Sequence, residues 1–263
     1  MSDPHHLTNL SWTEARDHLS NPRAVGLLPI GAIEAHGPHL PLDTDVCLSI
    51  EWCERISAAL DGGDVPENAV GPRRTCLILP PSLLSVTKCA GGFAGTLGLQ
   101  PGTERALLSD LLDSLGRHSL SAVALVNSHL EPEHVAILES LASESASSTK
   151  KPRVLFVNHC RKPWALELGE EFRGGDCHAG AYETALMLAS RFRDRVRTQI
   201  ARGLPAAYHG LITQLRSGVT RFEQMGAAQA YFGNPAAATA EEGERLWSVL
   251  VRMWLEPLRA IAG

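Results

Sequence analysis

Two continuously apolar segments stand out along the chain, at residues 24–31 and 122–127. Runs in which successive residues are all apolar, with no alternation of polar positions, are typical of strands buried on both faces of a parallel sheet. Shorter apolar runs at 75–79 and 154–158 predict two further strands. Helical segments lie between these runs, and such alternation indicates an α/β layer architecture.

Capping residues and helical periodicity set the expected helices. Ser11-Trp-Thr-Glu14 has the pattern of a capping box and predicts the first helix. Thr239 caps the last one, which should reach residue 260. The other expected helices span residues 45–59, 101–118, 134–143 and 181–191. The small polar residues at 145–151 indicate a surface loop. We therefore expect one layered α/β/α domain over residues 1–263, with a mostly parallel central sheet and no internal repeat.

The composition is that of an ordinary globular protein. Of the 263 residues 44% are hydrophobic and 20% charged, and the net charge of −5 gives no reason to expect nucleic acid or an anionic membrane as a partner. The apolar runs are far shorter than the roughly 20 residues that a membrane span needs. The first six residues lack the basic and apolar regions of a signal peptide. These features predict a cytoplasmic protein.

The six cysteines form no C-x-x-C pair, so the sequence favours neither a zinc knuckle nor a disulfide framework. Most should be buried thiols. Cys177 is adjacent to His178, which raises the hypothesis of a cysteine hydrolase. Neighbouring residues rarely point at one another, however, and a nucleophile needs a base within hydrogen-bonding reach. The pair therefore favours this hypothesis only weakly.

Histidines and carboxylates follow two of the predicted strands. Glu34-Ala-His36 lies in a loop rich in glycine and proline after the first strand, and Asp45 begins the following helix. His129-Leu-Glu131 comes directly after another strand. In open α/β sheets ligands bind beyond the carboxyl ends of strands, so these loops predict a shared site. Imidazole and carboxylate ligands without thiolate suit zinc or manganese. Each motif alone is also common in loops that bind no metal.

The segment 31–45, which reads GAIEAHGPHLPLDTD, closely resembles the signature of the creatininase (creatinine amidohydrolase) family. Three further segments resemble family motifs in the same order: FAGTL at 93–97, VNSHLE at 126–131 and HAGAYET at 178–184. The segment 233–243 resembles a family ending. The resemblance covers residues from about 24 to 250, nearly the whole chain, and implies a creatininase-like fold.

The resemblance also implies a ligand set for two divalent ions, zinc or manganese. Glu34, Asp45 and His129 would bind one ion, while His36, Asp45 and Glu131 would bind the other. Asp45 would bridge them, and a hydroxide between the ions would attack the amide carbonyl.

Two further residues take roles by resemblance. His178 matches a histidine that binds no metal and would protonate the leaving nitrogen as a general acid. Glu183 either orients a ligand or His178, or is a helix N-terminal charge favoured by the helix dipole. Relatives of this kind form homo-oligomers, often hexamers, so we expect assembly.

Departures from the family pattern bear on the substrate. Ser128 replaces a glycine, Pro132 stands where asparagine is common, and residues 88–92 lack a histidine that many members have. Residues 173–176, RGGD, stand where creatinine-specific members have tryptophan, and Trp164 is the only tryptophan nearby. These changes argue against creatinine. We expect hydrolysis of a cyclic amide, lactam or related small molecule; a formamide deformylase, a small-peptide amidase and a non-catalytic metal-stabilised binding protein are the alternatives.

Overall fold

A four-stranded parallel sheet forms the centre of the protein. The computed structural model describes residues 5–61, 76–148 and 152–261. The strands are β1 (Val25–Ile30), β2 (Cys76–Ile78), β3 (Ala122–Asn127) and β4 (Arg153–Leu155), in the spatial order β2-β1-β3-β4. β1 pairs in parallel with β2 and β3 on its two sides, and β3 pairs in parallel with β4. This confirms the predicted parallel sheet.

Helices cover both faces of this sheet. The α-helices are α1 (Trp12–Leu19), α2 (Thr44–Asp61), α3 (Pro101–Leu115), α4 (Pro132–Ala146), α5 (Gly169–Gly174), α6 (Ala181–Leu188), α7 (Thr198–Gly203), α8 (Leu211–Arg216) and α9 (Ala240–Ala260). Short 3₁₀ helices are η1 (Leu7–Asn9), η2 (Trp164–Leu166), η3 (Arg193–Arg195) and η4 (Pro235–Ala237). None of the helices within the described ranges is long and apolar enough to cross a membrane.

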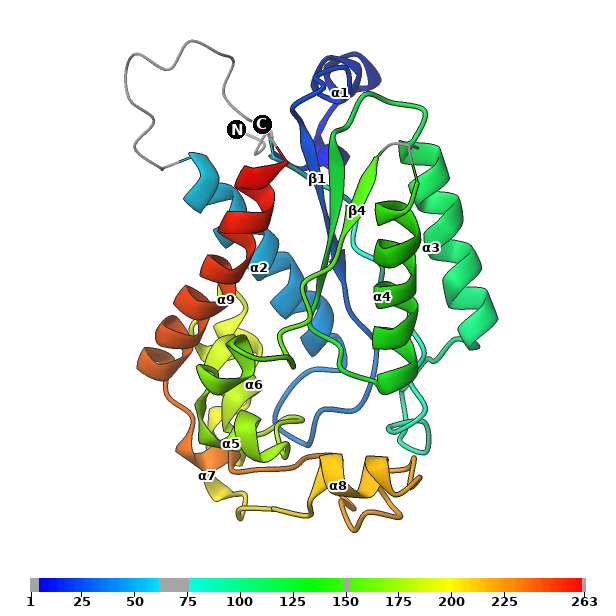
Figure 1. Ribbon diagram of the computed structural model, residues 1–263. Coiled ribbons are helices and arrows are strands. Elements are labelled where there is room, and N and C mark those ends of the chain that lie inside the picture. The colour runs from blue at the N-terminus through cyan, green and yellow to red at the C-terminus, as the bar shows by residue number, and fades with distance from the viewer. Residues whose placement is uncertain (1–4, 62–75, 149–151, 262–263) are drawn as a thin grey trace.

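The two faces of the sheet have separate apolar cores. Alternate residues of a strand point to opposite faces. Val25 and Leu27 of β1 therefore join a core with Trp52 of α2 and with residues of α6 and α9. Leu28 and Ile30 join the other core, which α3 and α4 complete. Figure 1 shows α2 and α9 on one side of the strands and α3 and α4 on the other. The expected α/β/α layering is confirmed.

Several element boundaries differ from the sequence expectation. The capping box at Ser11 is present in full. α4 begins at Pro132 and continues to Ala146, so the loop expected at 145–151 begins later, and residues 149–151 lie outside the described ranges, as does Thr75. α5, α7 and α8 were not predicted; each has six residues, too few to give a helical periodicity.

Close packing at the end of β1 places the first of the predicted loops. Gly31 follows the strand and lies against the start of α2, where an added Cβ would be 2.5 Å from the backbone nitrogen of Val46. Only glycine allows the chain to approach the helix so closely. β1 and β3 are neighbours in the sheet, so the loops that follow their carboxyl ends emerge side by side. Asp45 at the start of α2 lies next to both loops.

Candidate metal centre

Buried histidines and carboxylates converge beyond the carboxyl ends of β1 and β3. Among the described residues, three groups have ligand atoms within 4.8 Å of one another: Glu34, His36 and His178; Glu34, Asp45 and His129; and His36, Asp45 and Glu183. They come from the loop after β1, the start of α2, the loop after β3 and the start of α6. The structure therefore brings together four of the five predicted ligands, with His178 and Glu183 beside them.

Each of the three histidines is oriented by a backbone carbonyl. His36 Nδ1 lies 3.1 Å from the Glu34 carbonyl oxygen, and His129 Nε2 lies 2.8 Å from that of Val86. His178 Nε2 lies 2.9 Å from the Ala35 carbonyl oxygen. A carbonyl only accepts, so each of these nitrogens carries the ring proton and donates it. The other ring nitrogen faces the carboxylates and offers its lone pair to a metal when the ring is neutral, the arrangement usual for metal-binding histidine.

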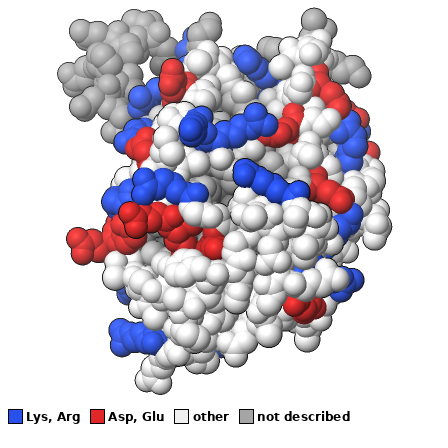
Figure 2. Space-filling view, turned by 60° about the horizontal axis from the view of Figure 1, so that its bottom comes forward, with Lys and Arg blue, Asp and Glu red and all other residues white. Residues whose placement is uncertain are grey.

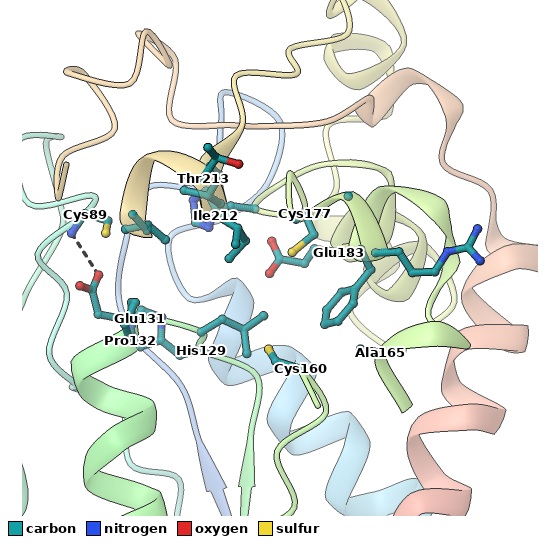
Figure 3. Close-up of a pocket in the computed structure, with 18 of the residues that line it drawn as sticks. Cys89, His129, Glu131, Pro132, Cys160, Ala165, Cys177, Glu183, Ile212 and Thr213 are labelled. Atoms are coloured by element: carbon teal, nitrogen blue, oxygen red, sulfur yellow. Dashed lines mark hydrogen bonds between the residues drawn. The ribbon is translucent and has the colours of Figure 1, made fainter. Parts of the chain in front are cut away.

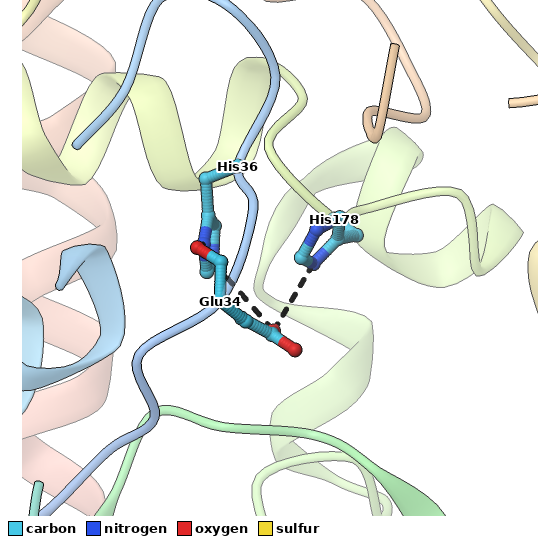
Figure 4. A group of neighbouring side chains, drawn as sticks. All are labelled: Glu34, His36 and His178. Atoms are coloured by element: carbon cyan, nitrogen blue, oxygen red, sulfur yellow. Dashed lines mark hydrogen bonds and ion pairs between the residues drawn. The ribbon is translucent and has the colours of Figure 1, made fainter. Parts of the chain in front are cut away.

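Asp45 lies between two of these lone pairs. Its Oδ1 is 3.3 Å from His36 Nε2, and its Oδ2 is 3.2 Å from His129 Nδ1. Glu34 Oε1 is 3.3 Å from His129 Nδ1. Figure 4 shows the Glu34 carboxylate between His36 and His178, with separations of 4.0 and 3.7 Å.

Several of these buried atoms have no hydrogen-bond partner. They are His36 Nε2 and both carboxylate oxygens of Asp45. Burying a carboxylate without a partner is costly, so such atoms call for a cation. Nitrogen and oxygen donors of this kind, without a thiolate, fit zinc or manganese. The donor atoms present therefore fit ions of this kind.

The pKa shifts of the clustered side chains also fit a site for a cation. Burial by itself lowers the pKa of His36, but Asp45 and the other carboxylates outweigh burial and raise it to about 10. Burial also lowers the pKa of His129, but Glu34 and Asp45 outweigh burial and raise it well above its usual range. Burial opposes ionisation of Asp45, yet His36 and His129 hold the pKa of Asp45 well below its usual range. Without metal, protons on the histidines thus balance the carboxylates.

Glu183 belongs to one of the three groups, whereas Glu131 lies beside them. Glu183 Oε2 lies 3.6 Å from His36 Nε2 and accepts a hydrogen bond of 2.6 Å from the Ala179 amide. Burial raises the pKa of Glu183 to about 8. Glu131 belongs to none of the three groups; its carboxylate accepts from the Cys89 amide at 3.1 Å. Figure 3 shows Glu131 turned toward Cys89, away from Glu183.

His178 lies in a strained turn. The next residue, Ala179, has φ of +50°, which is uncommon for a residue with a side chain. The ring packs against Phe222, with centroids 4.6 Å apart. Burial, together with the charge of His36, lowers the pKa of His178 to about 4. His178 is therefore neutral near pH 7, with Nδ1 unprotonated.

His178 is not placed to act as a base for the adjacent Cys177. Both ring nitrogens of His178 face other groups, the Ala35 carbonyl and the Glu34 carboxylate. Burial raises the pKa of the Cys177 thiol well above its usual range, so the thiolate is scarce. The geometry thus disfavours the cysteine hydrolase hypothesis.

A cavity of about 490 Å³ opens over the cluster. Its floor includes Glu34, Asp45, His129, His178 and Glu183. Apolar walls come from Leu130, Phe172, Leu211, Ile212, Leu215 and Phe222. Figure 3 shows Ile212 and Thr213 of α8 above Cys177 and Glu183.

Charge of one sign does not dominate this end of the molecule. Besides the metal cluster, the charged side chains that line the cavity are Glu131, Lys162, Arg173 and Arg216. Figure 2 shows side chains of both signs across the upper half of the face that includes α8, and mostly uncharged residues below.

Comparisons with known proteins place the chain in a family. The sequence model of the family described as creatinine amidohydrolase (Creatininase) matches residues 8–258. The chain is 32% identical to a mycofactocin precursor peptide peptidase of Mycolicibacterium smegmatis, over 86% of this chain and 80% of that protein. It is 27% identical to a creatinine amidohydrolase of Pseudomonas putida, over 68% of this chain and 69% of that one.

Solved structures of creatininases share the fold. A creatinine amidohydrolase (creatininase) structure superposes with a TM-score of 0.72 and 23% identity, covering 99% of this chain and 97% of that chain. A structure described as "Creatininase Mn" gives 0.71 and 21%, covering 97% and 98%. A creatininase variant of "Zn-Zn type" gives 0.72 and 21%, covering 98% of both chains.

Proposed function

Because the chain belongs to the creatininase family, we propose that it cleaves an amide C–N bond with two divalent ions held by the buried cluster. The chain is a creatininase-like amidohydrolase, a hydrolase of C–N bonds other than ordinary peptide bonds. The single observation that carries the proposal is the convergence of histidine ring nitrogens on buried carboxylates, with both oxygens of Asp45 lacking a hydrogen-bond partner.

The groups suggest how the ligands divide. Glu34, Asp45 and His129 would hold one ion, and His36, Asp45 and Glu183 would hold the other. Asp45 would bridge them, because its two oxygens face His36 and His129 separately. Such a pair of ions, when bound, polarises an amide carbonyl and supplies hydroxide near neutral pH. Zinc and manganese both suit these donors.

His178 would move the proton. Its Nδ1 faces the cluster without a proton, since Nε2 donates to the Ala35 carbonyl. Nδ1 can accept a proton from the attacking water and pass it to the departing nitrogen. The walls of the cavity would meanwhile orient the substrate and exclude bulk water.

The cavity supports a substrate larger than creatinine. Its volume of about 490 Å³ lies within the range of roughly 300–1,000 Å³ typical of pockets for drug-sized ligands. Its aromatic lining is Phe172 and Phe222, with no tryptophan among the described lining residues. We infer a cyclic amide, lactam or related small molecule with an apolar substituent. A peptide-derived amide is the second candidate, favoured by the cavity's size and by the 32% identity to a peptide peptidase.

Metal analysis and an amide screen would test this proposal together. Protein purified without chelator, or reconstituted with zinc or manganese, should contain two ions per chain. It should hydrolyse some member of a panel of lactams, hydantoin-like rings, formamides and short apolar peptides. Fewer than one ion per chain after reconstitution would contradict the metal site, and creatinine turnover at roughly 1–10³ s⁻¹ would contradict the substrate inference.

A protein that binds two ions but turns over nothing in the panel would favour the alternative of a metal-stabilised binding protein.

Two further expectations, the oligomeric state and the location in the cell, remain predictions. Light scattering would test the expected homo-oligomer, a hexamer being the form anticipated from family resemblance. Fractionation would test the cytoplasmic location.

A further inference from the structure

A buried acid and a buried histidine lie behind the metal cluster. Glu104 of α3 is 1% exposed, and His134 of α4 is 0% exposed. Neither belongs to the three groups of candidate ligands. A carboxylate is rarely buried unless its oxygens are satisfied, so the partners of Glu104 show what it does.

The first set of contacts runs from Glu104 to the ring of His129. Glu104 Oε2 accepts a hydrogen bond of 2.7 Å from the Val86 amide. The carbonyl of the same residue accepts the His129 Nε2 proton at 2.8 Å. Glu104 thus fixes the segment whose carbonyl sets the tautomer of His129 and leaves its Nδ1 free for metal.

The second set runs from Glu104 to the backbone of His129. Glu104 Oε1 pairs with His134 Nδ1, and His134 Nε2 lies 2.9 Å from Asn127 Oδ1. Asn127 then contacts His129 at both ends of the residue: Oδ1 accepts from the His129 amide at 3.1 Å, and Nδ2 donates to its carbonyl at 2.6 Å.

These hydrogen bonds fix the positions of most of the protons on the side chains involved. The backbone of His129 fixes the orientation of the Asn127 side-chain amide, because an amide donates and a carbonyl accepts. His134 Nε2 therefore faces an acceptor and must carry a proton. One proton then remains between His134 Nδ1 and Glu104. A glutamine at 104 could satisfy the same positions, accepting from Val86 and donating to His134 Nδ1.

We propose that Glu104 and His134 are positioning residues that hold His129 in its ligand geometry, through its ring and its backbone at once. The inference rests on the proposed two-ion site. Its consequence is selective: the ion bound by Glu34, Asp45 and His129 depends on this network, whereas the ion bound by His36, Asp45 and Glu183 does not.

Calorimetric titration of the metal-free protein with Zn²⁺, with metal content measured after dialysis, would test the proposal. In Glu104→Ala one of the two affinities should fall by about 10–100-fold, the usual loss when an outer hydrogen-bond partner of a ligand is removed. The other affinity should stay unchanged. Glu104→Gln should keep both affinities, because it preserves the hydrogen bonds. His134→Ala cuts only the second set of contacts and should weaken the same ion less.

Leu108→Ala is the matched control. Leu108 lies one turn along α3 from Glu104 and is fully buried in the core, so its loss destabilises the helix without touching the network. It should lower the unfolding temperature and leave both affinities intact. If Glu104→Ala and His134→Ala both retain two wild-type affinities, or if they weaken the binding of both ions equally, the positioning role is overturned. A wild-type protein that binds no ions overturns the proposed function, and this inference with it.

Discussion

At the scale of single residues, the proposed ligands are the side chains whose donor atoms lie close to one another in the three groups. Glu131 satisfies one oxygen on the Cys89 amide and belongs to none of the ligand groups. Glu183 also accepts a hydrogen bond from a backbone amide, yet its carboxylate faces His36, and burial raises its pKa because the charged form is disfavoured there. The sequence analysis made Glu131 a ligand because H-x-E is a local motif that matches the family pattern, and that assignment stays a prediction beside the proposed one. Glu183 reaches the cluster only through tertiary packing.

Paired substitutions of the two carboxylates would test the assignment. We expect Glu183→Gln to lose about one ion per chain, because a neutral amide is a poor ligand for these metals. Glu131→Gln should keep both ions, since its carboxylate is directed at Cys89. Metal content after dialysis gives the measurement. Retention of two ions by Glu183→Gln, with loss by Glu131→Gln, would return the assignment to the one made from sequence.

His178 should prove to be a proton carrier. We expect His178→Ala to retain both ions but to lower kcat by about 10²–10⁴-fold with little change in KM. Activated anilides should lose less, because their leaving group needs less protonation. His209→Ala is a suitable control, since His209 is exposed. Loss of an ion from His178→Ala would instead make His178 a ligand, in keeping with its group with Glu34 and His36.

At the scale of elements, the sequence predicted the strands and helices that local patterns specify. β1 and β3 were predictable because both are apolar at nearly every position, and α1 and α9 because of Ser11 and Thr239. α8 was not predictable, since it has six residues and no side-chain cap on its preceding residue. Its start is held instead by Asp176, which accepts from the Gly210 amide at 3.0 Å and the Leu211 amide at 2.6 Å. The Glu104–His134 network was missed for a similar reason, because its partners are 30 residues apart.

The anchoring of α8 can be tested through the cavity wall that it forms. Asp176→Ala removes two hydrogen bonds and should loosen α8, raising KM while both ions stay bound. Hydrogen exchange of the segment 209–218 should speed up. Thr239→Ala is the control: it removes the cap of α9 at a cost of about 0.5–2 kcal/mol without contacting the cavity. An unchanged KM and unchanged exchange in Asp176→Ala would show that α8 does not depend on this carboxylate.

At the scale of the whole molecule, the cluster joins parts of the chain that are distant in sequence. The loop after β1 and the start of α2 supply three candidate ligands, and β3 leads into His129. Glu183 comes from α6, which follows β4 along the chain. Both layers of helices contact this junction: α2 and α6 lie on one face of the sheet, while α3 and α4 orient His129 from the other. Bound ions should therefore stabilise the whole fold, and not only the loops that contact them.

That stabilisation should depend on pH. Without metal, the folded-state pKa of His36 is raised to about 10, above an unfolded value near 6.5, and that of His129 is raised as well. Their contribution to stability is fully present below about pH 6.5 and is lost as pH rises toward 10. Glu183, whose pKa is raised to about 8, acts in the same direction, because the fold must give up its proton as pH rises. The metal-free protein should accordingly weaken between pH 6 and 9.

Metal reverses this trend, since ions bind the deprotonated ligands and their affinity increases as protons leave. An ion present at 100 times its Kd adds about 2.7 kcal/mol, and each kcal/mol raises Tm by roughly 2–4 °C in a chain of this size class. We therefore expect chelation to lower Tm by several degrees, and by more at pH 8 than at pH 6. Differential scanning calorimetry at both pH values, with Asp45→Asn as a control that should show no metal-dependent shift, gives the measurement. A shift that is equal at the two pH values, or larger at pH 6, would mean that the histidines do not exchange protons for metal.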